Sequence, residues 1–116
     1  MGNYIIEFYC TEDGTEPARI FIESLDAKMI AKVLKIMDLL EQNGPLTRLP
    51  YSEHLHDGIF EIRAKQGTTI VRVLYFFSFG KKIVLTHGFV KKTQETPKRE
   101  LEKALQYRID YERRCK

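Results

Sequence analysis

The chain has 116 residues, of which 43% are hydrophobic and 30% are charged, with only four prolines and seven glycines. This length is typical of one domain, and the composition excludes intrinsically disordered and collagen-like polypeptides. The longest apolar run, residues 73–77, is far too short to cross a bilayer, and the N-terminus has no secretory signal pattern. Residues 1–116 are therefore expected to form one cytoplasmic domain without membrane association.

Basic charge is concentrated in the second half of the chain. Residues 1–50 carry five Lys/Arg against eight Asp/Glu, whereas residues 51–116 carry fourteen against eight. Such an excess attracts a polyanion such as nucleic acid, or an acidic protein, although a solvated helix face gives the same pattern. The two cysteines, Cys10 and Cys115, form no CxxC pair and are interpreted as inert thiols in a reducing compartment.

The first half of the chain predicts a strand followed by two helices. Residues 4–10 are aromatic and β-branched, as is typical of a strand. Pro17 is suited to open a short helix that ends near Leu25, and Asp26 is a candidate N-cap for a second helix, which stops at residues 43–45. The apolar residues of the second helix recur at helical spacing: Met29, Ile30, Val33, Ile36, Met37 and Leu40. The two helices are expected to form a hairpin that covers a sheet.

The second half predicts three strands and a final helix. Residues 45–57 show no clear period and are expected to be irregular. Three segments that follow, 59–65, 68–77 and 82–89, are joined by short turns and predict an antiparallel meander. Thr96-Pro97 is expected to open the terminal helix. The order β-α-α-β-β-β-α predicts an α+β fold, in which the first strand and the helical hairpin pack on a small antiparallel sheet.

Charged side chains interrupt two of the apolar strands. Glu61 and Arg63 are expected on the same strand face as Ile59, because side chains alternate along a strand. Arg72 stands inside an apolar segment, where burying a cation without a partner is costly. Arg72 is therefore expected either to form a structural pair with Glu61 on the neighbouring strand or to line a concave polar site.

A second group of polar residues ends the last strand. His87 is expected in phase with Ile83, Leu85 and Phe89, a position in which a lone histidine is most often a core residue. Lys91 and Lys92 follow directly, and adjacent lysines attract phosphate but are also common on surfaces. Taken alone, this group therefore leaves a binding role and a structural role open.

The two groups together predict RNA chemistry. If the strands are neighbours, the following residues converge on one face: Arg63, Arg72, His87, Lys91 and Lys92. Cleavage of RNA without a metal requires a group that accepts the proton of the ribose 2′-OH, cations that stabilise the phosphorane, and a group that protonates the 5′-oxygen. Arginine suits the phosphate role because its planar fork is permanently charged. No cofactor is expected.

Three motifs, residues 57–63, 71–75 and 87–97, resemble the RelE/ParE superfamily of toxins, and more narrowly its phage-derived HigB-type branch. The resemblance extends from the first strand to the terminal helix, and Lys-Lys-Thr with the following proline is its most specific motif. It implies a RelE-like fold, a bacterial or phage cytoplasm, and a cognate antitoxin, expected to be a helix-turn-helix protein. RelE-type members cleave mRNA in the ribosomal A site, whereas ParE-type members poison DNA gyrase.

The resemblance implies roles for the basic residues. Arg63 and Arg72 would bind the scissile phosphate, and Lys91 or Lys92 would hold the RNA backbone or assist the leaving group. Lys65 and Lys98 are further candidates for RNA binding: both are basic and lie close to these motifs.

The proton acceptor is left open between Glu61 and His87. Some RelE-type members carry a lysine where Glu61 stands, so a lysine base is not transferred to this chain. A zinc site built from His54, His56 and His87 is not expected, because their spacing matches no standard site.

The favoured function is the toxin of a type II toxin–antitoxin module, acting as a ribosome-dependent mRNA endonuclease with mRNA and the ribosome as partners. The phosphate-binding set favours this function, because a poison that only binds a protein needs no phosphate chemistry. The alternatives are a ParE-type gyrase inhibitor without catalysis of its own, and an inactive phage-derived interaction domain.

Overall fold

The computed structural model describes residues 4–48, 50–91 and 95–114. Its elements follow one another as β1 (Ile5–Phe8), α1 (Pro17–Glu23), α2 (Ala27–Asn43), a short 3-10 helix η1 (Gly44–Leu46), β2 (Ser52–His56), β3 (Ile59–Gln66), β4 (Thr69–Ser78), β5 (Lys82–Val90) and α3 (Lys98–Arg114). The α+β order predicted from the sequence is confirmed, with one additional strand, β2. Within the described residues, no helix is long and apolar enough to cross a membrane.

The strands form one mixed five-stranded sheet in the order β1-β5-β4-β3-β2. The predicted antiparallel meander is confirmed as β3, β4 and β5, and the first strand, β1, joins this sheet as a parallel neighbour of β5. A parallel pairing is possible here because α1, α2 and the next strands separate β1 from β5 along the chain.

The prediction that residues 45–57 are irregular is wrong, because β2 lies within them. This strand pairs antiparallel with β3 at the edge of the sheet, and a register shift between His54 and His56 interrupts its alternation. Among the residues of β2 only Ser52 is buried. A polar edge strand with a bulge has no period-two apolar pattern, so β2 could not be predicted from the sequence.

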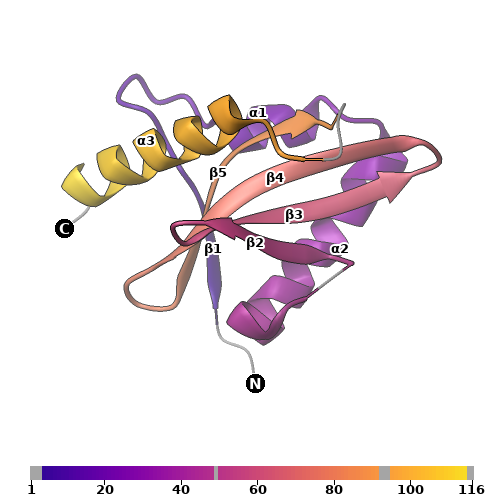
Figure 1. The fold of residues 1–116 in the computed structure, drawn as a ribbon, viewed down its shortest axis with the longest axis horizontal. Coiled ribbons are helices and arrows are strands. Elements are labelled where there is room, and N and C mark those ends of the chain that lie inside the picture. The colour runs from indigo at the N-terminus through magenta and orange to yellow at the C-terminus, as the bar shows by residue number, and fades with distance from the viewer. Residues whose placement is uncertain (1–3, 49, 92–94, 115–116) are drawn as a thin grey trace.

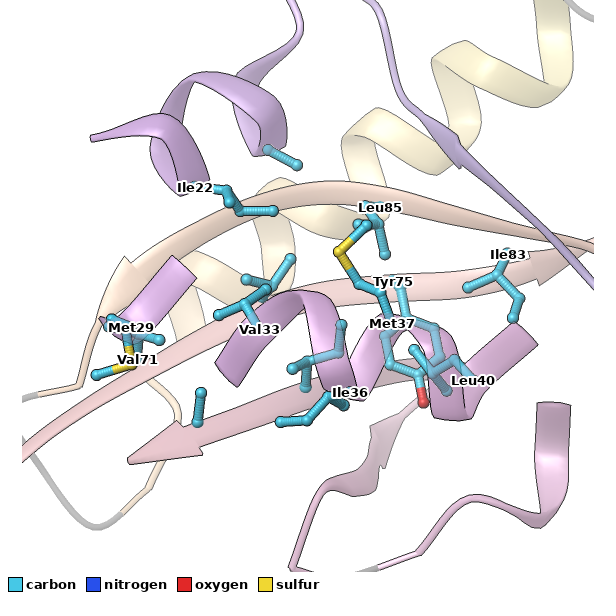
Figure 2. Close-up of a cluster of buried hydrophobic side chains, with 14 residues drawn as sticks. Ile22, Met29, Val33, Ile36, Met37, Leu40, Val71, Tyr75, Ile83 and Leu85 are labelled. Carbon is cyan, nitrogen blue, oxygen red and sulfur yellow. The ribbon is translucent and has the colours of Figure 1, made fainter. Parts of the chain in front are cut away.

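The two faces of the sheet are covered by different helices (Figure 1), α1 and α2 on one side and α3 on the other. The predicted N-cap of α2 is confirmed, because the Asp26 carboxylate accepts a 2.8 Å hydrogen bond from the Met29 N–H. Figure 2 shows the apolar stripe of α2 packed against the strands, as its helical spacing predicts. The main core therefore lies between the sheet and the helical hairpin.

A smaller apolar cluster lies under α3, on the opposite face of the sheet. Its buried members are Tyr9, Ile59, Leu74, Phe76, Val84, Ala104 and Tyr111. Beside this cluster, the same face carries buried polar residues, among them Glu61, Arg72 and His87. The face under α3 is thus half apolar and half polar, and the polar half is where the candidate site lies.

A bulge in β5 decides which way His87 points. Tyr75 pairs with Leu85 but Leu74 pairs with His87, so Thr86 is an extra residue between the two pairs. The expectation that His87 shares a face with Ile83 and Leu85 is therefore wrong, whereas the expected alignment with Phe89 is confirmed. Leu85 faces the helical hairpin, whereas His87 faces α3.

Candidate functional site

The centre of the polar half is an ion pair between Glu61 on β3 and Arg72 on β4. Glu61 is 0% exposed and Arg72 is 3% exposed, and the Arg72 Nη1 donates to the Glu61 Oε2. Thr96, just before α3, closes the cluster: it accepts from the Arg72 Nη1 at 3.0 Å and donates to the Glu61 Oε1 at 2.6 Å. Of the two possibilities for Arg72, the structure shows the buried pair with Glu61.

The predicted orientation of β3 is confirmed, because Ile59 and Glu61 both lie on the α3 face. In the described part of the chain, the buried Nε of Arg72 has no hydrogen-bond acceptor. A buried donor without an acceptor costs about 1–3 kcal/mol, so this atom retains an unused capacity to bind an anionic oxygen.

His87 forms a second buried group next to this pair. Its Nδ1 lies 3.1 Å from the Thr86 Oγ1, and its Nε2 lies 3.0 Å from the Glu100 Oε1 on the first turn of α3. The ring packs edge-on against Tyr107 with 5.8 Å between centroids. Burial lowers the pKa of His87, and the hydrogen bond and negative charge of Glu100 oppose that shift.

The lowered pKa of His87 makes stability depend on pH. The unfolded chain binds a proton near the ordinary histidine pKa of about 6.5, whereas the folded chain resists protonation below it, so folding is favoured above that value and loses stability as the pH falls. Between the two pKa values the free energy of unfolding is expected to change by up to about 1.4 kcal/mol per pH unit. Urea unfolding of wild type and His87→Gln at a series of pH values checks this. An identical pH dependence for both proteins would contradict it.

Arg63 and Lys91 form the accessible edge of the site. The Arg63 side chain is 29% exposed, its Nη1 lies 2.9 Å from the Glu53 Oε1, and its Nε lies 3.9 Å from the Glu61 Oε2. Lys91 follows β5 and is half-buried. Partial burial lowers the pKa of Lys91, and the positive charges of Arg72 and Arg63 lower it further. Three cations therefore lie close enough together to favour an anion among them.

Most of the predicted catalytic residues share this region. Glu61 contacts both Arg63 and Arg72, the positive charges of both arginines lower the pKa of Lys91, and His87 lies on the same sheet face. Lys92 lies outside the described residues.

The other predicted residues lie elsewhere. Lys98 is exposed at the first residue of α3, and Lys65 is exposed near the end of β3. His54 packs against Phe60 at 4.9 Å between ring centroids, and His56 pairs with Asp57 at 2.9 Å, so the histidines considered for zinc make separate contacts.

Sequence reasoning missed three partners of the site, Glu53, Thr96 and Glu100. Glu53 lies on the unpredicted strand β2, opposite Glu61. Thr96 and Glu100 flank the start of α3, and a hydroxyl and a carboxylate at that position are ordinarily explained by helix capping. The sequence around Thr96 and Glu100 does not indicate that their side chains contact residues on the distant strands of the sheet.

The comparisons with known proteins agree with this architecture. The sequence profile of the family described as phage-derived protein Gp49-like matches residues 20–108. A similar solved structure is the crystal structure of the archaeal RelE–RelB complex from Pyrococcus horikoshii OT3, with a TM-score of 0.50 and 18% identity over 81% of this chain and 99% of that chain. That likeness shows a RelE fold. The search of curated proteins finds no match. With the profile spanning most of its length, the chain belongs to the Gp49-like family of phage-derived proteins.

Proposed function

We propose that this protein is the toxin of a type II toxin–antitoxin module of the HigB type, and that it cleaves ribosome-bound mRNA. The observation that carries the proposal is the grouping of Arg63, Arg72 and Lys91 beside a buried histidine on one face of the sheet. The solved structure with the same fold is a RelE protein in complex with RelB, which supports the choice of reaction and of an antitoxin partner. The proposed setting is the cytoplasm.

The accessible cations, Arg63 and Lys91, are the first to contact the scissile phosphate of the RNA. Arg63 has a partly exposed guanidinium, and its ion pair with Glu53 at the surface is weak enough to exchange for a phosphate oxygen. Lys91 adds a second charge beside it, and its lowered pKa makes it a better proton donor to a leaving oxygen than an ordinary lysine. Arg72 lies behind them and supplies the planar fork that fits a phosphorane.

Of the two candidate bases, His87 is the better one. Glu61 is the buried counter-ion of Arg72, so a proton on Glu61 would leave the Arg72 cation without its partner. The Nε2 of His87 is occupied only by Glu100 and becomes free when Glu100 moves, and burial lowers the pKa of His87 so that its neutral form is present at neutral pH. In the reaction, His87 accepts the 2′-OH proton, the 2′-oxygen bonds to phosphorus, and the bond from phosphorus to the 5′-oxygen breaks as that oxygen is protonated. The products are a 2′,3′-cyclic phosphate and a 5′-hydroxyl.

Access to this chemistry depends on the start of α3. Arg72 and His87 are each 3% exposed. At the start of α3, Thr96 contacts Arg72 and Glu100 contacts His87. A phosphate therefore reaches Arg72 and His87 only when Thr96 and Glu100 move away. The proposed antitoxin, a helix-turn-helix protein, would act by keeping this surface covered.

Expression in bacterial cells without the antitoxin tests the function. We expect translation to fall and transcript ends to appear inside translated regions, each with a 5′-hydroxyl, as detected by end mapping. Transcripts that stay intact while gyrase-dependent DNA breaks accumulate would show a ParE-type inhibitor instead. Intact transcripts and intact DNA would show an inactive interaction domain.

A further inference from the structure

A hollow of about 330 Å³ lies at the edge of the sheet, between α2 and the end of β3. It exists because β3 continues to Gln66, whereas its pairing with β2 ends where Ile62 faces Ser52. An adjoining hollow of about 290 Å³ shares Arg63 and Lys65 with the first. We call the two hollows together the basic groove; its polar lining is Lys32, Lys35, Tyr51, Arg63 and Lys65.

The basic groove carries positive charge that the described residues do not neutralise. Lys32, Lys35 and Lys65 are exposed, and none of them forms an ion pair with a carboxylate in the described ranges. No acidic residue is among the described residues that line either hollow. Among the groove cations, Arg63 alone has acidic partners within the described part of the chain. A concave surface with one sign of charge concentrates ligands of the opposite sign, so the groove fits a polyanion.

The aromatic residue beside these cations distinguishes RNA from an acidic protein. Tyr51 is 42% exposed and lies at the groove, where its ring can stack on an unpaired base. Cations that follow a backbone together with an exposed aromatic ring are the usual way to bind a single strand. An acidic peptide would use the lysines but not the ring.

The basic groove also connects to the candidate site. Arg63 lines the groove, and its Nε lies 3.9 Å from the Glu61 Oε2 at the centre of the site. An RNA strand that lies along Lys32, Lys35 and Lys65 therefore passes Arg63, which is at the accessible edge of the site.

We propose that the basic groove is a binding site for single-stranded RNA, with phosphates on Lys32, Lys35 and Lys65 and a base stacked on Tyr51, and that it leads the strand to Arg63. The proposal rests on the proposed function in naming RNA as the polyanion. It adds a positioning site, on α2 and the edge of β3, to the catalytic face under α3.

Fluorescence anisotropy with a short labelled single-stranded oligoadenylate tests the lysines. For Lys32→Gln/Lys35→Gln we expect roughly tenfold weaker binding near 0.1 M salt, and a salt-dependence slope smaller by about 1.4, because two phosphate contacts are lost. Arg19→Gln/Arg113→Gln is the matched control. It removes the same charge from exposed positions on α1 and α3 and is expected to leave the affinity nearly unchanged.

Tyr51 provides an independent readout. Tyr51→Ala is expected to weaken binding by about 5- to 100-fold, as loss of one stacked base predicts, whereas Tyr51→Phe should bind like wild type.

Three results would overturn the proposal: no binding of the oligonucleotide by wild type, an equal loss in the control variant, or displacement of the RNA by polyglutamate with Tyr51→Ala unaffected, which would indicate an acidic protein ligand. The assay contains no ribosome and measures no cleavage. Binding without cleavage in cells would therefore reject the proposed function alone, and cleavage without groove binding would reject the groove alone.

Discussion

Replacing Arg72 with alanine is expected to lower the free energy of unfolding by about 3–5 kcal/mol, because the change leaves the carboxylate of Glu61 buried without its cation. Cleavage is expected to fall as well, by about two to three orders of magnitude, the usual loss for one transition-state donor. Urea unfolding and cleavage of ribosome-bound mRNA, measured on the same preparation, check both effects. A single substitution does not separate them, since a partly unfolded protein also loses activity.

The double variant Glu61→Met/Arg72→Leu separates stability from catalysis. Removing both charges abolishes the stranded carboxylate, and an apolar pair of similar volume is often as stable as a buried ion pair. We expect this variant to regain most of the lost stability while its cleavage rate stays low. If it folds like wild type and also cleaves like wild type, the Glu61–Arg72 pair is structural only.

Replacing Arg63 with alanine is expected to lower the cleavage rate by about 10²- to 10³-fold with little loss of stability. Arg63 is partly exposed, and its ion pair with Glu53 at the edge of the sheet is worth at most about 1 kcal/mol. The rate is measured under single-turnover conditions with saturating protein.

Glu53→Gln is the matched control for Arg63→Ala. It breaks the same ion pair but leaves the guanidinium in place, and its cleavage rate is expected to stay within a few fold of wild type. Equal losses in Arg63→Ala and Glu53→Gln would assign the effect to the ion pair instead of to phosphate binding.

The elements of the fold that follow from local periodicity could be predicted from the sequence. The apolar stripe of α2, the N-cap Asp26 and the meander of β3, β4 and β5 each depend on residues close together in the chain. The parallel pairing of β1 with β5 depends on chain topology, and β2 is a polar edge strand with a bulge. Neither of these features leaves a periodic pattern in the amino-acid sequence.

The candidate site, like the fold, could be predicted only where it depends on local sequence. Strand alternation placed Glu61 on the face of Ile59, and the cost of burying a cation left two possibilities for Arg72, of which the pair with Glu61 is the one observed. The bulge at Thr86 reversed the face of His87, because one extra residue shifts the alternation of every residue beyond it. The contacts of Thr96 and Glu100 depend on how α3 docks across the sheet, which local sequence does not encode.

The proposed cleavage is tested most directly by the reaction of the purified protein with ribosomes programmed with a defined mRNA, with naked mRNA as the comparison. We expect cuts within the ribosome-bound coding region that leave 2′,3′-cyclic phosphate and 5′-hydroxyl ends, formed about 10²- to 10³-fold more slowly when folded Arg63→Ala replaces wild type. Intact ribosome-bound mRNA in the presence of folded wild type, with arrested gyrase in a parallel supercoiling reaction, would contradict the proposed cleavage.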